Sequence, residues 1–208
     1  MNLRQHEGRD GYKVWLSSDE LDKLIEAAPN ASAGIAFALG GRCGLRSQEV
    51  ADVTPKDIQH TDAGPILRVV GKGEKYREAW IPDQLVTRIE TAASFRDMPD
   101  HLPIVQSSGD SRKVSTRTLR RWIADAAAEL VVETDDDAWA QVSFHDLRRS
   151  WATNLAAAGV DPILVLDVGG GQTSRHSWIT TAEATHPRRT GVSAKRWPGY
   201  NPVKTASL

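Results

Sequence analysis

Apolar residues recur at helical spacing along most of the chain, which predicts a mainly α-helical protein. The clearest example follows Ser115, a favourable helix N-cap, and places five apolar side chains on one face. These are Leu119, Trp122, Ile123, Ala126 and Leu130. The same spacing, together with capping residues and terminal glycines or prolines, predicts further helices within residues 16–30, 33–44, 47–53, 83–93, 144–159 and 161–170.

Two short runs depart from this pattern and predict one β-hairpin. Residues 66–70 and 77–81 are rich in β-branched and aromatic side chains, and Gly71 and Gly73 between them can form the turn. The charged stretch 135–141 is predicted to be a loop. After Gly171 the periodicity disappears, and proline and glycine become frequent, so we expect irregular or disordered structure there.

Composition limits the class of protein. A length of 208 residues with 40% hydrophobic residues suits one medium domain with a real core. The lone cysteine, Cys43, cannot form an internal disulfide, which favours a reducing cytoplasm. No apolar run is long enough to span a bilayer, and the first residues are too polar for a secretory signal. We therefore expect a cytoplasmic protein without a membrane segment.

The net charge of −1 hides an asymmetry between two parts of the chain. Residues 171–208 contain six Lys or Arg and one Glu, a net charge of +5, whereas residues 1–170 sum to −6. An abrupt change of this kind marks a boundary. The simplest interpretation of residues 171–208 is a solvated basic tail.

Four side chains suit the binding of a phosphodiester. Arg46 follows a glycine turn, Lys72 lies at the hairpin tip, and His145 and Arg148 are helix neighbours three residues apart. Arginine can grip a phosphate through two parallel hydrogen bonds, and lysine or histidine can protonate a leaving oxygen. Each residue also has an ordinary alternative, such as an Arg46 salt bridge to Glu49 or a solvated lysine. No acidic cluster or zinc spacing predicts a metal site.

Three segments that contain these residues resemble, in order, the catalytic domain of the tyrosine recombinases, the phage integrase family. Residues 40–58 resemble its first box, residues 69–82 its lysine hairpin, and residues 144–165 its second box, His-x-x-Arg. The resemblance runs from about Trp15 to Gly170. It implies a mainly α fold with a small antiparallel hairpin sheet. It also implies site-specific DNA breakage and joining through a 3′-phosphotyrosine, without a metal or nucleotide cofactor.

The resemblance also implies residue roles. It assigns binding of the scissile phosphate to three residues: Arg46, His145 and Arg148. Lys72 would be the general acid, with Lys75 as the alternative, and both would contact DNA. Glu49 would support Arg46.

The last two catalytic groups of the family have no counterpart in the sequence. The expected His or Trp falls at Gly171, and the expected nucleophilic Tyr falls near Thr180, Thr181 or, in a looser match, Ala184. The tyrosines of the chain are Tyr12, Tyr76 and Tyr200. A threonine hydroxyl is a far poorer nucleophile than a phenol unless a base activates it. The printed chain therefore lacks a recognised nucleophile.

Our hypothesis for this loss is a reading-frame shift near residues 169–171. With a one-base shift, the codons of residues 170–184 can spell a Gly-Gly-Trp turn followed by a Tyr at the spacing of the family. The Tyr would come from Thr180 and Thr181 and needs one particular wobble base. The alternative is an authentic divergent tail.

We therefore divide the chain into an N-terminal extension, residues 1–14, a tyrosine-recombinase catalytic domain, residues 15–170, and an irregular basic tail, residues 171–208. Family members usually carry an N-terminal domain that clamps DNA. We expect a remnant or stand-alone catalytic domain that binds double-stranded DNA weakly and with strong salt dependence. Active members of the family form tetramers on DNA. The tail shows no helical face for such exchange, so we expect a monomer in solution.

Three functions remain open. The first is a recombinase or integrase whose strand transfer is impaired because the nucleophile is missing. The second is a non-enzymatic DNA-binding or regulatory remnant, in which residues 115–122 and the basic tail hold the phosphate backbone. The third is an active enzyme that uses Tyr200.

Overall fold

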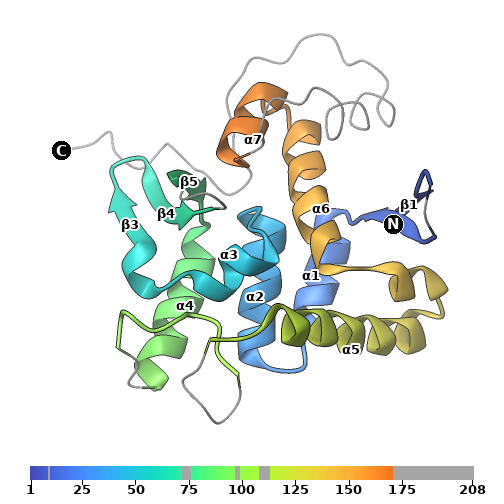
Figure 1. Cartoon of the computed structure of the whole chain (residues 1–208), viewed down its shortest axis with the longest axis horizontal. Coiled ribbons are helices and arrows are strands. Elements are labelled where there is room, and N and C mark those ends of the chain that lie inside the picture. Colours follow the sequence, from blue (N-terminus) through green and yellow to red (C-terminus); the bar gives the residue numbers. More distant parts are fainter. Residues whose placement is uncertain (9, 72–75, 97–98, 108–112, 171–208) are drawn as a thin grey trace, which may run out of the picture.

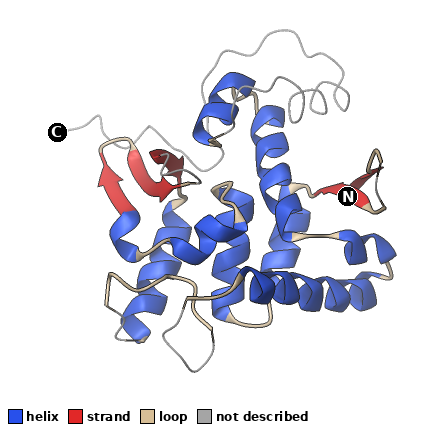
Figure 2. Cartoon of the chain, viewed as in Figure 1, coloured by secondary structure: helices blue, strands red, loops and turns tan. Residues whose placement is uncertain are grey.

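The computed structural model describes residues 1–170, apart from residues 9, 72–75, 97–98 and 108–112 (Figure 1). Helices dominate this part of the chain, as predicted, and Figure 2 shows the strands confined to two small sheets. The α-helices are α1 (Ser18–Glu26), α2 (Ala31–Arg42), α3 (Ser47–Asp52), α4 (Asp83–Phe95), α5 (Thr116–Thr134), α6 (Phe144–Ala157) and α7 (Pro162–Val168). Two 3₁₀ helices are η1 (Pro55–Asp57) and η2 (Asp137–Gln141).

The apolar helix α2 lies at the centre of the fold (Figure 1). It packs against α1, α3, α4, α5 and α6. All but two of its residues are buried, which agrees with a sequence that is almost entirely alanine, glycine and larger apolar residues. The turn after α2 leads into Arg46, so a buried helix of the core positions the start of the candidate site.

The predicted hairpin is present, and a third strand extends it. Strands β3 (Ile58–Thr61), β4 (Gly64–Val70) and β5 (Tyr76–Trp80) form one antiparallel sheet in the order β3-β4-β5. In its register Val69 faces Arg77 and Leu67 faces Ala79. Leu67, Val69 and Ala79 are all buried, so one face of the sheet belongs to the core. The hairpin tip, residues 72–75, lies outside the described residues.

The expectation of a single hairpin is wrong, because β1 (Asn2–Gln5) and β2 (Tyr12–Trp15) form a second one. It is joined to the main body through the β2 end. The Val14 backbone N–H donates to Asp146 Oδ1 at 3.1 Å, and the Leu16 backbone N–H donates to Ser150 Oγ at 2.8 Å. Strand β2 therefore crosses the predicted boundary at residue 15 and is tied directly to α6.

The loop prediction for residues 135–141 is also wrong. The Asp136 side chain caps the 3₁₀ helix η2 by accepting from the Ala138 backbone N–H, at 2.9 Å. Trp139 is buried among the core residues, which fixes this short turn against the main body. A sequence of charged residues around one tryptophan therefore forms an ordered connection between α5 and α6.

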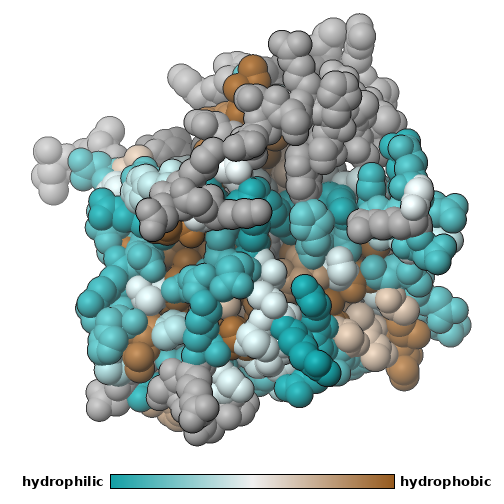
Figure 3. Space-filling model, in the orientation of Figure 1, coloured by the Kyte–Doolittle hydropathy of each residue, from teal (hydrophilic) through white to brown (hydrophobic). Residues whose placement is uncertain are grey.

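Helix α7 is the last described element, and it packs against α6 and β5. Its predicted start at Pro162, in the first helical position, is confirmed. Trp151, Leu155 and Val165 form a small apolar cluster between α6 and α7. Among the described residues, no helix is long and apolar enough to cross a membrane. The face drawn in Figure 3 is mostly hydrophilic, with scattered apolar patches.

Candidate functional site

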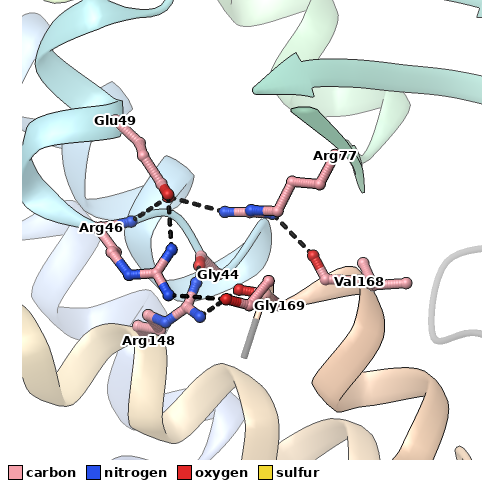
Figure 4. Close-up of polar contacts among 8 residues, drawn as sticks. Gly44, Arg46, Glu49, Arg77, Arg148, Val168 and Gly169 are labelled. Atoms are coloured by element: carbon pink, nitrogen blue, oxygen red, sulfur yellow. Dashed lines mark hydrogen bonds and ion pairs between the residues drawn. The ribbon is translucent and has the colours of Figure 1, made fainter. Parts of the chain in front are cut away.

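A buried carboxylate in α3 connects two arginines. Glu49 Oε1 accepts a hydrogen bond from Arg46 Nη1 at 2.7 Å, and Glu49 Oε2 accepts one from the Arg46 backbone N–H at 2.8 Å. Arg77 Nη2, from strand β5, donates to Oε2 at 2.7 Å (Figure 4). Burial alone would raise the pKa of Glu49, but the Arg46 backbone N–H and the Arg77 and Arg46 guanidinium groups outweigh it and lower the pKa. Glu49 is therefore a fixed negative charge shared by two cations.

A third arginine comes from α6. Arg148 is buried, and its guanidinium donates from Nη1 to the carbonyl oxygen of Gly44 and from Nη2 to that of Gly169 (Figure 4). Burial, and then the nearby charges of Arg46 and Arg77, lower the pKa of Arg148 to about 9. Within the described part of the chain, the hydrogen bonds of the Arg148 guanidinium go to carbonyl oxygens and none goes to a carboxylate.

The turn that carries Arg46 depends on Gly44. Its φ of +68° lies in the left-handed region, and a Cβ there would be 2.5 Å from two ring atoms of Trp151. A glycine at this position lets the chain turn sharply from α2 to α3 while the Trp151 ring packs against it. The same turn presents the Gly44 carbonyl oxygen to Arg148.

The three arginines meet the end of α7 through its main chain. Arg77 Nη1 donates to the Val168 carbonyl oxygen at 2.8 Å, and Arg46 Nη2 donates to that of Gly170 at 3.0 Å. Arg148 donates to the Gly169 carbonyl oxygen between them. Three successive carbonyl groups thus each accept from one arginine.

The local charge favours an anion. Three guanidinium groups and one carboxylate give these four side chains, Arg46, Glu49, Arg77 and Arg148, a net charge of +2. Carbonyl oxygens contribute only partial negative charge, so a phosphate would relieve the repulsion among the cations. Among the described residues, no group of three or more His, Cys, Asp or Glu side chains is placed to hold a metal ion. The arrangement can bind and orient an oxyanion.

The structure thus brings two of the sequence-predicted residues, Arg46 and Arg148, to one turn. His145 lies in the first turn of α6, three residues before Arg148, with an exposed side chain. Lys72 and Lys75 lie outside the described residues.

Two residues that support the site were not identified from the sequence. Arg77 alternates along β5 with buried Ala79, a period-two signal that a charged side chain points toward the core. Asp146 is 2% exposed and accepts from the backbone N–H and the hydroxyl of Ser143 and from Val14 N–H, besides its ion pair with Arg149. Asp146 therefore fixes the start of α6, and with it the helix that carries His145 and Arg148.

Comparison with protein families gives a match over most of the chain. A model described as the phage integrase family matches residues 14–181. The tyrosine recombinase XerA of Pyrococcus furiosus is 29% identical over 172 residues, which cover 81% of this chain and 55% of the relative. The tyrosine recombinase XerC of Rhizobium meliloti is 28% identical over 195 residues, which cover 90% of this chain and 54% of the relative. The chain therefore spans a little over half the length of these curated relatives.

Solved structures show the same fold. A crystal structure of XerA recombinase has a TM-score of 0.64 and 25% identity, with 84% of this chain and 61% of that chain covered. XerH recombinase bound to its difH substrate in a pre-cleavage complex has a TM-score of 0.63 at 20% identity, covering 84% and 51%. A lambda integrase dimer bound to a COC′ core site has a TM-score of 0.59 at 16% identity, covering 87% and 51%. The predicted fold class, a mainly helical recombinase catalytic fold with small antiparallel sheets, is confirmed.

Proposed function

The chain belongs to the phage integrase family, and we propose that it is a DNA-binding catalytic domain that holds one phosphodiester of duplex DNA with Arg46 and Arg148. One observation carries the proposal: both guanidinium groups reach the Gly169–Gly170 turn, in surroundings with surplus positive charge. The crystal structures of DNA-bound recombinases with this fold agree with DNA as the partner.

Arg46 and Arg148 would have different roles in phosphate binding. The Arg46 side chain is 42% exposed, so it would meet a phosphate that approaches from solvent. Arg148 is buried and would supply positive charge from the interior, where a low dielectric strengthens electrostatic interactions. Both charges would stabilise the additional negative charge of a pentacovalent transition state. His145, exposed on the same helix as Arg148, is the third proposed phosphate ligand.

Protonation of the leaving 5′ oxygen is assigned by family resemblance to Lys72, or to Lys75 in its place. This assignment stays a prediction. No step of the proposed reaction needs a metal ion or a nucleotide cofactor. Duplex DNA would be the partner of a cytoplasmic protein that is monomeric in solution.

The nucleophile decides whether the chain cleaves DNA. Tyr12 and Tyr76 are the tyrosines in the described part of the chain, and both are exposed strand residues. The Tyr76 hydroxyl donates to Glu78 Oε1 at 2.8 Å, which raises the pKa of Tyr76 and opposes formation of a nucleophilic phenolate. We therefore propose that the printed chain binds DNA without completing strand cleavage. The same observation favours the second candidate, a non-enzymatic DNA-binding remnant.

A suicide-substrate experiment tests these alternatives. Nicked duplexes with a randomised core would be incubated with the printed chain, with Tyr200→Phe, and with a chain whose residues after Gly170 are recoded in the shifted frame. We expect a covalent protein–DNA adduct only with the recoded chain. An adduct with the printed chain that Tyr200→Phe abolishes would identify Tyr200 as the nucleophile. No adduct with any of the three, despite DNA binding, would favour the non-enzymatic remnant.

A further inference from the structure

We infer that Arg77 is a positioning residue of the phosphate site: it neutralises Glu49, so that the positive charge of Arg46 stays available to phosphate. This inference rests on the proposed function, because it concerns the same phosphate. It adds a residue from the hairpin strand β5 to a site whose other arginines come from α6 and from the turn before α3.

Arg77 is placed to act through Glu49 and through the end of α7. Its side chain is only 8% exposed, and its two terminal nitrogens are both occupied. Nη2 donates to Glu49 at 2.7 Å, and Nη1 donates to the Val168 carbonyl oxygen at 2.8 Å (Figure 4). Arg77 Nε is buried and makes no hydrogen bond within the described residues. The side chain therefore bridges α3 and the end of α7.

The charge balance gives the bridge its proposed role. Glu49 is 4% exposed and lies three residues after Arg46, so without Arg77 the two would form a closed, neutral pair. Arg46 would then offer phosphate a guanidinium whose charge is already compensated. Arg77 supplies the compensating charge from the interior, because it contacts the Oε2 atom of the same carboxylate. The charge of Arg46 remains in surplus at the surface.

The second end of Arg77 acts on the main chain. By holding the Val168 carbonyl oxygen, Arg77 fixes the last turn of α7 against β5. The next two carbonyl oxygens, of Gly169 and Gly170, then meet Arg148 and Arg46. One buried side chain thus sets both the charge and the orientation of the groups that would grip phosphate.

Loss of an ion pair that only stabilises the fold could also weaken DNA binding. The test therefore measures the energetic coupling between Arg77 and Glu49 in DNA binding. The affinity for a fluorescent duplex DNA would be measured for Arg77→Gln, Glu49→Gln and the double variant, with thermal unfolding in parallel. We expect Arg77→Gln to weaken binding at least tenfold in the parent chain, and at most threefold in the Glu49→Gln background. An equal loss in both backgrounds would mean a structural role and would overturn the inference.

A matched control and a conservative variant complete the experiment. Arg96→Gln removes an arginine that donates to Ser32 Oγ at the other end of α2, and it should leave DNA affinity unchanged. Arg77→Lys keeps the charge beside Glu49 but cannot reach both of the Arg77 acceptors. We expect it to bind DNA more tightly than Arg77→Gln and within tenfold of the parent, because it keeps the charge but loses the contact with the Val168 carbonyl oxygen. A loss as large as that of Arg77→Gln, or a loss of more than tenfold if Arg77→Gln does not fold, would overturn charge compensation.

The failure of this inference differs from the failure of the proposed function. If Arg148→Gln weakens DNA binding and Arg77→Gln does not, only the role of Arg77 is overturned. If Arg148→Gln and Arg46→Gln both leave DNA affinity unchanged, the proposed function is overturned, and the inference with it.

Discussion

The guanidinium of Arg148 donates a hydrogen bond to the carbonyl oxygen of Gly44, which ties the middle of α6 to the turn that leads into Arg46. The two segments are 104 residues apart in sequence. The chain at Gly44 adopts a left-handed conformation next to the Trp151 ring. This turn brings the guanidinium of Arg46 near that of Arg148. The geometry of this turn, α6 and the end of α7 leads to four predictions beyond the Arg77 experiment.

Gly44→Ala should destabilise the fold strongly. The added Cβ would meet the Trp151 ring at 2.5 Å on a backbone with φ of +68°, so we expect a loss of about 3 kcal/mol or more in the free energy of unfolding. Urea unfolding measures it. Gly159→Ala is the control, because its φ is also positive, at +86°, but nothing lies within 4 Å of its Cβ. A loss no greater than that of Gly159→Ala would show that the Trp151 contact is unimportant.

Arg148→Gln should separate stability from DNA binding. Truncation of a buried, hydrogen-bonded charge at an interface commonly costs about 2–5 kcal/mol of binding, so we expect at least a tenfold loss of DNA affinity. The substitution removes two hydrogen bonds, which destabilises the fold. It also removes a desolvated positive charge that is repelled by Arg46 and Arg77, which partly offsets that loss of stability. We therefore expect the free energy of unfolding to fall by less than about 2 kcal/mol. Unchanged affinity in a folded Arg148→Gln chain would contradict the proposed phosphate site.

Inorganic sulfate should stabilise the protein by occupying the arginine site. At a concentration equal to its dissociation constant, a single bound ion adds about 0.4 kcal/mol, or roughly 1–2 °C in the thermal midpoint. Sulfate also has a general stabilising effect, so the comparison is with Arg46→Gln in the same salt and with chloride at equal ionic strength. Identical sulfate shifts in both proteins would mean that sulfate does not bind at Arg46.

The ion pairs of Glu49 should make stability depend on acid pH. The pKa of Glu49 is lowered from its ordinary value of 4.5 in the fold, so its ionised form stabilises the protein above that value. This contribution disappears as pH falls from about 4.5 through the lower pKa of the folded state. Urea unfolding of the parent and of Glu49→Gln between about pH 6 and pH 3 should show the gap between them shrinking. A gap that stays constant over this range would contradict the assignment.

The helices could be predicted from the sequence because helix caps and the spacing of apolar residues are local features. Ser115 caps α5 as expected, and the predicted apolar face of α5 is buried. The N-terminal hairpin was missed because every residue of β1 is exposed, so that strand carries no alternation of apolar and polar residues. Its position depends instead on β2, through a hydrogen bond from Val14 to Asp146 in α6.

The residues of the candidate site likewise include some that the sequence predicts and one that it does not. Arg46 and Arg148 follow short motifs that can be recognised without knowledge of the fold. Arg77 could be placed only by knowing that β5 packs beside α7 and close to α3, which no local pattern states. Its alternation with Ala79 nevertheless marks a charge on a buried strand face, and such a charge requires a buried partner.

The acceptors at the end of α7 are main-chain oxygens, which are present whichever residue is encoded at each position. A one-base insertion or deletion near residues 169–171 would replace the side chains that follow, yet Val168, Gly169 and Gly170 would still present carbonyl groups to the arginines. A residue other than glycine at position 170 would be strained, because φ there is +62°. Under the proposed function, such a gene would lose strand cleavage in one mutational step and would still encode a protein that binds DNA.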